Sequence, residues 1–395
     1  MRLARTTEPW KRYRRRLLHA AYDARRERYD AIVRAKGAVY RESDVGPAVA
    51  KRLRSRGYEP KVRSRGEVHT FAFIPRIGWH AALYPDLALL GPVSDFDYAA
   101  EGYTAEEFSR GTEADEARRV EMNEKFVARV REVHARQPID WIYVYASGLE
   151  ILGSTLRRIS DAIGVPIVNM CLDDKQSWEG AAFGGQRNGQ VDIARQFDLC
   201  WTSARIACDW YLAEDAVPVY MPEGFDQMVY RPMDVPRDID VSFIGGAYGF
   251  RSAVVEFLRK HGVDIRVYGT GWKTTSVWGE KQIKVINRSA INLGMGGIGY
   301  SEELTNVKTR DFEIPGTGGG LYLTSFNPDL ALHFRIGEEI VCYRNRDEML
   351  ELIRYYLRRP EEARAIADRA RQRCLRDHRW LHRYDRVCQL LGILI

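Results

Sequence analysis

The fold class is decided by one stretch of the sequence, IDVSFIGGAYGFRSAVVEFLRKHGVDIRVYG, residues 239–269. The apolar run IDVSFIGG predicts a strand, and RSAVVEFLRKHG carries its apolar residues at helical spacing. VDIRVYG then predicts the next strand. Apolar strands that alternate with helices are typical of a parallel sheet with both faces covered. The stretch therefore predicts an α/β unit.

The same rhythm runs through the rest of the chain. In the first half, strands are predicted at HTFAFIP, DWIYVYA, VPIVNMCLDD, FDLCWTS and VPVYMP, and after residue 270 they are predicted at INLGM, GLYLT and EIVCY. A chain of 395 residues exceeds what one hydrophobic core covers. We therefore expect two Rossmann-like parallel-sheet domains that face a central cleft, joined by the Pro-rich residues 222–236. The expected ranges are 1–225, 226–375, and a last helix at 376–395 that crosses back to the first domain.

Composition limits the compartment and the partners. The chain is 45% apolar and 29% charged, and it has no apolar run near the length of a membrane span. Its six cysteines include no CxxC pair, which argues against disulfides and against a metal site. We expect a soluble, cytoplasmic protein.

The net charge of +6 is concentrated before residue 40, in WKRYRRRLLHAAYDARRERYDAIVRAK. No nucleic-acid-binding motif accompanies it, so no nucleic-acid partner is expected. This basic segment is either a solvated helix face or a contact with the inner membrane surface or another anionic partner.

Two loops of the second half follow predicted strands. Gly245 and Gly246 end one strand, and Arg251 opens the next helix, where free backbone N–H groups favour an anion. Gly269 and Gly271, in YGTGW, would let a flat nucleobase approach the backbone. Neither the GxGxxG fingerprint nor the P-loop pattern is met, so simple tight turns remain the alternative.

A third loop has the densest chemistry, in NVKTRDFEIPGTGGGLYLT, residues 306–324. Lys308 and Arg310 suit phosphate oxygens, and Glu313 suits the two hydroxyls of a ribose. Gly318 and Gly319, with the glycines beside them, would present N–H groups to a pyrophosphate. The alternative is a glycine-capped helix end with a surface ion pair.

These residues carry a resemblance to a known family. Arg310, Phe312, Glu313, Pro315 and the pair Gly318–Gly319 follow in order the pattern of the CgeB-like glycosyltransferases, which have the GT-B fold. The joint MPEGFDQMVYRP, residues 221–232, also resembles the GT-B interdomain linker, and the resemblance covers about residues 221–380.

The resemblance implies that Glu313 binds the ribose of a nucleotide-sugar donor, with Arg310 and Lys308 near the diphosphate. It also implies that neither a metal nor a cofactor is needed. Many retaining enzymes of this fold carry a second glutamate eight positions earlier, and Thr305 stands there in this chain. Retention of the anomeric configuration is therefore mildly preferred.

The first half is expected to hold the acceptor and any base. His80 follows a strand beside Trp79, where proton transfer is its usual role, although a structural histidine is the commoner case. Asp173 and Asp174 also end a strand, and they suit either sugar hydroxyls, a base or a helix cap. Residues 91–103, GPVSDFDYAAEGY, are interpreted as a loop that either lines an acceptor groove or lies at the surface.

The leading hypothesis is a metal-independent glycosyltransferase that uses a nucleotide-diphosphate sugar. Its acceptor is a glycan, a lipid-linked sugar, a protein or a natural product. Two alternatives remain open, namely a nucleotide-sugar epimerase of the same fold and a non-catalytic nucleotide-sugar-binding or assembly protein.

Overall fold

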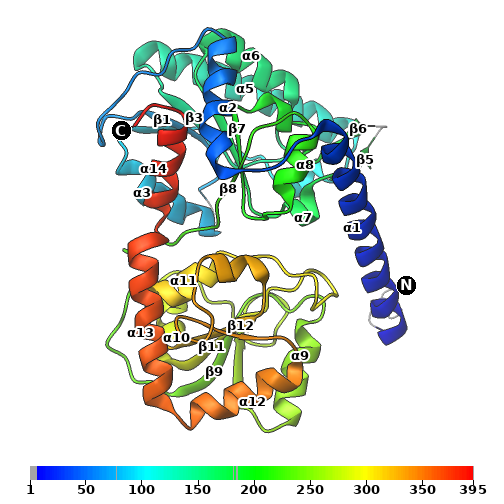
Figure 1. Ribbon diagram of the computed structural model, residues 1–395, viewed down its shortest axis with the longest axis vertical. Helices are drawn as coiled ribbons and strands as arrows, with labels where there is room; N and C mark the ends of the chain where they lie inside the picture. Colours follow the sequence, from blue (N-terminus) through cyan, green and yellow to red (C-terminus); the bar gives the residue numbers. More distant parts are fainter. Residues whose placement is uncertain (1–6, 77, 181, 184–185, 395) are drawn as a thin grey trace. The chain divides into compact units, whose positions relative to one another are not determined.

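The computed structural model describes residues 7–394 except residues 77, 181, 184 and 185 (Figure 1). The chain divides into two compact units. The six-strand unit comprises Arg26–Pro222 and the chain from Trp380 onward, and the five-strand unit comprises Glu223–Arg379 and the chain up to Arg25. Helix α1, Glu8–Lys36, contributes to both groups.

The six-strand unit has a parallel sheet in the order β2-β1-β3-β4-β7-β8. Its strands are β1 Thr70–Phe73, β2 Val93–Asp95, β3 Trp141–Val144, β4 Ile167–Cys171, β7 Leu199–Thr202 and β8 Pro218–Tyr220, with a small antiparallel pair of β5 Ala182–Phe183 and β6 Gln186–Arg187. Its helices are α2 Glu42–Ser55, α3 Tyr84–Ala88, α4 Ala105–Phe108, α5 Glu113–Arg136, α6 Gly153–Ile163, α7 Asp174–Ser177, α8 Ala207–Ala213 and α14 Trp380–Leu390, with short 3₁₀ turns at Gly78–Leu83 and Ala194–Gln196.

The last helix completes the core of the six-strand unit. Trp380 and Tyr384 of α14 are buried against the sheet, and the Tyr384 hydroxyl donates to the Leu83 carbonyl at 3.0 Å. The Leu381 N–H donates to the Asp86 carboxylate at 2.9 Å. These contacts hold the end of the chain on α3, more than 290 residues earlier in the sequence.

The five-strand unit has a parallel sheet in the order β10-β9-β11-β12-β13. Its strands are β9 Ile239–Ile244, β10 Ile265–Tyr268, β11 Ser289–Leu293, β12 Leu321–Ser325 and β13 Val341–Tyr343. Its helices are α9 Arg251–Lys260, α10 Glu280–Arg288, α11 Arg310–Thr317, α12 Arg346–Leu357 and α13 Pro360–Asp377, with a 3₁₀ turn at Pro328–Leu332.

Both faces of this second sheet are covered, because its side chains alternate between two cores. Leu321 and Leu323 pack with residues of α9 and α12, whereas Tyr322 packs with residues of α10, α11 and α13. This alternation follows from the period of two along a strand. The structure confirms the predicted α/β class with two Rossmann-like parallel sheets.

The unit boundaries differ from the predicted ends at residues 225 and 375. The linker after Pro222 already packs on the five-strand unit, where the Phe225 N–H donates to the His378 carbonyl at 3.0 Å. The Phe225 ring also lies under Gly316, where an added Cβ would come within 2.5 Å of it. The first turns of α1 were expected in the first domain, but they group with the five-strand unit.

One predicted loop contains a strand. Residues 91–103 include β2, which pairs in parallel with β1 at the sheet edge. The strand is short and half-buried, with Ser94 and Asp95 among its three residues, so it lacks the apolar run that identifies a buried strand.

Within the described residues, no helix combines the length and the apolar character needed to cross a bilayer. All six cysteines are buried thiols.

Candidate functional site

The loops that follow β9 and β10 meet at the carboxyl edge of the five-strand sheet. The Gly245 N–H donates to the Tyr268 carbonyl at 2.8 Å, and the Trp272 indole donates to the Gly245 carbonyl at 2.7 Å. Gly269 has a φ of 133°, and a Cβ there would lie 2.6 Å from the Gly245 oxygen. Gly246 and Gly271 belong to the same pair of loops. The structure thus brings four predicted glycines together. Their lack of a side chain allows the backbones of the two loops to approach closely.

A further glycine-rich loop, which follows β11, was not identified from the sequence. Gly294, Gly296, Gly297 and Gly299 follow Leu293 directly. A Cβ on Gly249, in the loop after β9, would lie 1.7 Å from the Gly299 oxygen. The signal was present in the sequence, since four glycines within six residues follow an apolar strand in INLGMGGIG.

Arg251 begins α9 beneath these loops and is only 1% exposed. Its guanidinium donates to the carbonyls of Gly246 at 3.2 Å and Met295 at 3.5 Å, and it lies 4.1 Å from the centre of the Tyr248 ring. Its Nε has no hydrogen-bond partner among the residues that the structure describes. Burial, and then the neighbouring charge of Arg310, lower the pKa of Arg251 to about 10.

Arg310 is the first residue of α11 and supplies the second cation of the site. Its Nη1 is buried without a hydrogen-bond partner, and the guanidinium lies 5.8 Å from the centre of the Phe243 ring, which Arg251 also contacts. Among the described residues, no ion pair joins Arg251 or Arg310 to a carboxylate. Two adjacent cations without an ion pair are costly to bury, so this pair is a candidate site for an anion.

The carboxylate next to Arg310 serves the fold. Asp311 accepts hydrogen bonds from the Lys308 N–H at 2.7 Å and from the Tyr322 hydroxyl. Burial raises the pKa of Asp311. This carboxylate fixes the start of α11 and places Lys308, which is half-buried, two residues ahead of Arg310.

Glu313 lies one turn after Arg310 on the same helix, so the two side chains share a face. It is 7% exposed, and the Tyr230 side chain lies near its carboxyl group. Burial raises its pKa to about 7, against the opposing effects of Tyr230 and Arg310.

The prediction for Gly318 and Gly319 is wrong, because they lie at the other edge of the sheet. They end α11 and precede Leu321, where β12 begins, whereas Gly245 follows the carboxyl end of the parallel strand β9. Gly318 has a φ of 68° as the C-cap of the helix, and a Cβ on Gly319 would lie 2.6 Å from the Ile286 oxygen. These glycines are needed for packing.

In the six-strand unit, His80 follows β1 within the 3₁₀ turn Gly78–Leu83. It is half-buried, with the rings of Trp79 and Tyr145 at 4.4 and 5.1 Å. Tyr145 follows β3, the neighbour of β1 in the sheet. An imidazole and two aromatic rings thus gather at the carboxyl edge of this sheet.

The two aspartates after β4 differ in their surroundings. Asp173 is half-buried at the start of α7 and accepts from the Gln176 amide at 3.0 Å. Asp174 is fully buried, with hydrogen bonds from the hydroxyls of Thr202 at 2.5 Å and Tyr211 at 2.8 Å. Burial raises the pKa of Asp174 to about 6. The expectation that Asp174 contacts a sugar or acts as a base is therefore corrected, because both of its oxygens serve the core.

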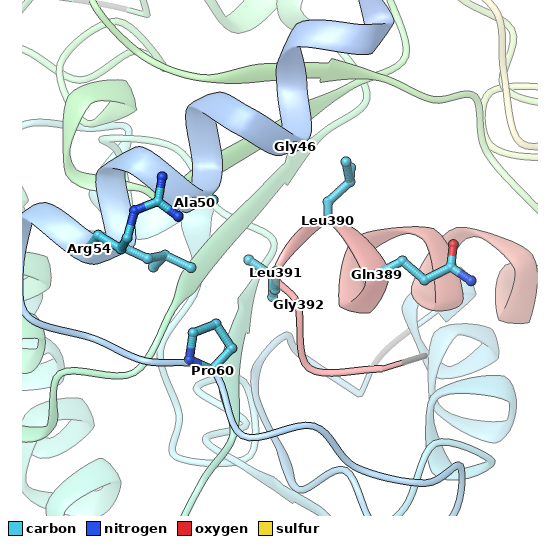
Figure 2. A pocket seen from close by; sticks show the side chains of 9 residues that line it. Gly46, Ala50, Arg54, Pro60, Gln389, Leu390, Leu391 and Gly392 are labelled. Carbon is cyan, nitrogen blue, oxygen red and sulfur yellow. The ribbon is translucent and has the colours of Figure 1, made fainter.

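Two pockets differ in their position relative to the predicted residues. One of about 210 Å³ opens at the carboxyl ends of β12 and β13 and is lined by Phe250, Glu302, Glu303, Ser325, Phe326, Tyr343, Arg344 and Asn345. Arg346 holds Glu302 through hydrogen bonds of 2.6 and 3.1 Å. The other, of about 290 Å³, lies between α2 and the end of α14, and Figure 2 shows its largely apolar lining with Arg54. It contains none of the predicted residues.

The described residues contain no cluster of three or more His, Cys, Asp or Glu side chains that would hold a metal ion.

Residues 251–389 match the family model described as glycosyl transferase-like. No curated protein sequence matches the chain.

Several solved structures share the fold. Anabaena Alr3699/HepE, solved with UDP and glucose, has a TM-score of 0.55 at 10% identity over 82% of this chain and 100% of that chain. AviGT4, a glycosyltransferase involved in avilamycin A biosynthesis, has a TM-score of 0.53 at 14% identity over 82% and 97%. Sucrose-phosphate synthase from Thermosynechococcus elongatus has a TM-score of 0.52 at 14% identity over 69% and 79%.

The protein thus has the GT-B fold of the glycosyltransferases. Within it, the part of the chain that matches the glycosyl transferase-like model runs from α9 into α14.

Proposed function

We propose that the protein is a metal-independent, CgeB-like glycosyltransferase that moves a sugar from a nucleoside diphosphate to an acceptor hydroxyl. The observation that carries this proposal is the pair Arg251 and Arg310, two neighbouring cations with buried N–H groups that no protein acceptor satisfies. Burying like charges together is costly unless an anion neutralises them. The diphosphate of a nucleotide sugar supplies that anion, and guanidinium forks match its oxygens.

The donor is assigned to the carboxyl edge of the five-strand sheet. Arg251, Arg310 and Lys308 bind the diphosphate, Glu313 accepts the ribose hydroxyls, and the turn at Gly269 and Gly271 lies open to the nucleobase. Ligands of open α/β sheets bind at this edge. The solved relative with UDP and glucose supports a nucleotide sugar as the donor class.

In the proposed reaction, the bond between the sugar C1 and the β-phosphate oxygen breaks and a bond from C1 to the acceptor oxygen forms. The leaving diphosphate gains negative charge, which the buried guanidinium groups of Arg251 and Arg310 stabilise. We propose that the anomeric configuration is retained and that the acceptor proton passes to the leaving phosphate. If the product instead had the inverted anomeric configuration, a base on the protein would accept the proton of the acceptor hydroxyl, and His80 is the candidate for that base.

The first test is thermal stabilisation by UDP-, GDP-, CMP- and dTDP-linked sugars, each with and without EDTA. A ligand at one hundred times its Kd adds about 2.7 kcal/mol to folding stability. We expect one nucleotide family to raise the Tm and EDTA to leave that rise unchanged. No rise with any donor would contradict the assignment of the site, and a rise abolished by EDTA would contradict metal independence.

The donor identified in this way is then incubated with candidate acceptors, and the products are examined by proton NMR. Transfer with an α- or β-linkage that matches the donor supports retention. Turnover of the donor sugar without any acceptor would identify an epimerase. Binding without turnover or transfer would identify a nucleotide-sugar-binding protein.

A further inference from the structure

The first half of helix α1 has an exposed face that the proposed reaction does not use. The segment KRYRRRLL, residues 11–18, has five cations in eight residues, and no acidic residue occurs between Glu8 and Asp23. Figure 1 shows this segment as part of one continuous helix, drawn in dark blue. A merely solvated helix face usually mixes charges of both signs.

One side of this helix packs on the five-strand unit. The rings of Trp10 and Tyr300 meet edge to face at 5.4 Å, and the His19 imidazole lies 2.8 Å from the Ser301 hydroxyl. Arg15 pairs with Glu303 at 3.7 Å. Arg15 and His19, four residues apart, mark the side of the helix that faces this unit, and by helical spacing Tyr13 and Leu17 lie on the opposite side.

The outward side is amphipathic. Tyr13 is 58% exposed and Leu17 is 45% exposed, and they lie one above the other because they are four residues apart. At the same helical spacing, Ala20 and Ala24 continue the apolar stripe, and both are exposed.

Arginines border this stripe on both sides. By helical spacing, Arg12 and Arg16 lie along one border and Arg14 lies along the other, and all three are exposed. Arg14 also lies over the Trp10 ring at 5.6 Å. Within the described residues, none of the three forms an ion pair with a carboxylate.

We propose that this face, defined by Arg12, Tyr13, Arg14, Arg16 and Leu17, docks on a membrane surface that contains anionic phospholipids. Such a surface uses both features of the helix. The apolar stripe enters the boundary between headgroups and acyl chains, and the arginines bind the lipid phosphates above it. A soluble polyanion would use the cations but would leave Tyr13 and Leu17 in water.

The test is co-sedimentation of the full chain with vesicles of phosphatidylcholine alone or with 30% phosphatidylglycerol, about 0.1 M NaCl being present in both. We expect binding only to the anionic vesicles. The triple variant Arg12→Gln, Arg14→Gln, Arg16→Gln should bind about 100-fold more weakly, since each cation near an anionic surface contributes about fivefold. Glutamine keeps the helical propensity, which circular dichroism checks.

A matched control removes three exposed cations of the six-strand unit, with Lys51→Gln, Arg54→Gln and Lys61→Gln. This control changes the net charge by the same amount and should bind anionic vesicles within about twofold of the unmodified protein. An equal loss in the control would overturn the proposal, because bulk charge would then explain the binding. Failure of the unmodified protein to bind anionic vesicles would overturn it as well.

The apolar stripe is tested separately by Tyr13→Gln with Leu17→Gln. This double variant should bind vesicles about tenfold more weakly or worse. High salt should abolish the binding that remains. Unchanged vesicle binding, or equally tight binding of double-stranded DNA by the unmodified protein, would assign the face to a soluble polyanion instead. Nucleotide-induced stabilisation, measured on the same samples, reports on the proposed donor site independently.

Discussion

Replacing Arg310 by glutamine should change stability and ligand affinity in opposite directions. Arg251 is buried beside it, and the lowering of the Arg251 pKa to about 10 means that keeping this side chain charged costs about 3 kcal/mol. Burial is the larger cause and Arg310 the smaller one. Removing Arg310 relieves this repulsion but also removes its attraction to Glu313 and Asp311, so the ligand-free protein should gain at most about 1 kcal/mol of stability.

The same substitution removes one charge-assisted contact to the proposed diphosphate. A hydrogen bond to a charged group contributes about 1.5–3 kcal/mol, so the Kd for the preferred nucleoside diphosphate should rise roughly 10- to 150-fold. Isothermal titration calorimetry measures the Kd, and urea denaturation measures the free energy of unfolding.

The control for Arg310→Gln is Arg364→Gln, an exposed cation of α13 in the same unit. It should change the free energy of unfolding by less than about 0.5 kcal/mol and should not change the Kd. A destabilised Arg310→Gln protein with unchanged nucleotide affinity would refute the reasoning, because Arg310 would then serve the fold and not the anion.

Three further substitutions probe buried groups. The raised pKa of Glu313 means that the folded protein holds this proton more tightly than the unfolded chain, so stability falls as the pH rises from about 4.5 to about 7. Glu313→Gln should therefore be more stable than the unmodified protein by up to about 3 kcal/mol at pH 8 and no more stable at pH 4, by urea denaturation. Asp174→Ala leaves two buried hydroxyls without their acceptor and should lower the free energy of unfolding by about 2–4 kcal/mol, while Asp174→Asn should cost less. Gly249→Ala should lower the Tm far more than Gly262→Ala, because both have positive φ but only Gly249 lies against backbone.

Each of these expectations has a clear contrary result. A pH-independent effect of Glu313→Gln would mean that the carboxyl group is ionised in the folded protein at acidic pH. A stable Asp174→Ala protein that has lost only catalysis would restore Asp174 to the active site. Equal Tm values for Gly249→Ala and Gly262→Ala would mean that the loop after β11 can move away.

Much of the fold was predictable because its signals are local. Runs such as DWIYVYA and IDVSFIGG became β3 and β9, since a strand buried on both faces must be apolar throughout. The edge strand β2 was not predicted, because its three residues are half-buried and do not need a continuous apolar run. The packing of the linker could not be predicted either, because the position of Phe225 depends on His378 and Gly316, which are distant in sequence.

For the candidate site, the sequence by itself determined the residue types and their order along the strands. Arg251 and Arg310 each begin a helix that follows a strand and its loop, and parallel strands bring such helix starts to one edge of the sheet. Glu313 follows Arg310 by three residues, which places both on one helix face. These relations depend only on the periods of helices and strands.

Only the tertiary structure decided which of the remaining polar and glycine residues serve the fold. Gly318 and Gly319 resemble a phosphate loop in sequence, yet they pack on α10 and on a neighbouring side chain at the opposite edge. Asp174 resembles a base after a strand, yet Thr202 and Tyr211 enclose it. The physical reason is the same in each case. Burial and hydrogen bonding are set by partners far away in the chain, and the residue itself does not encode them.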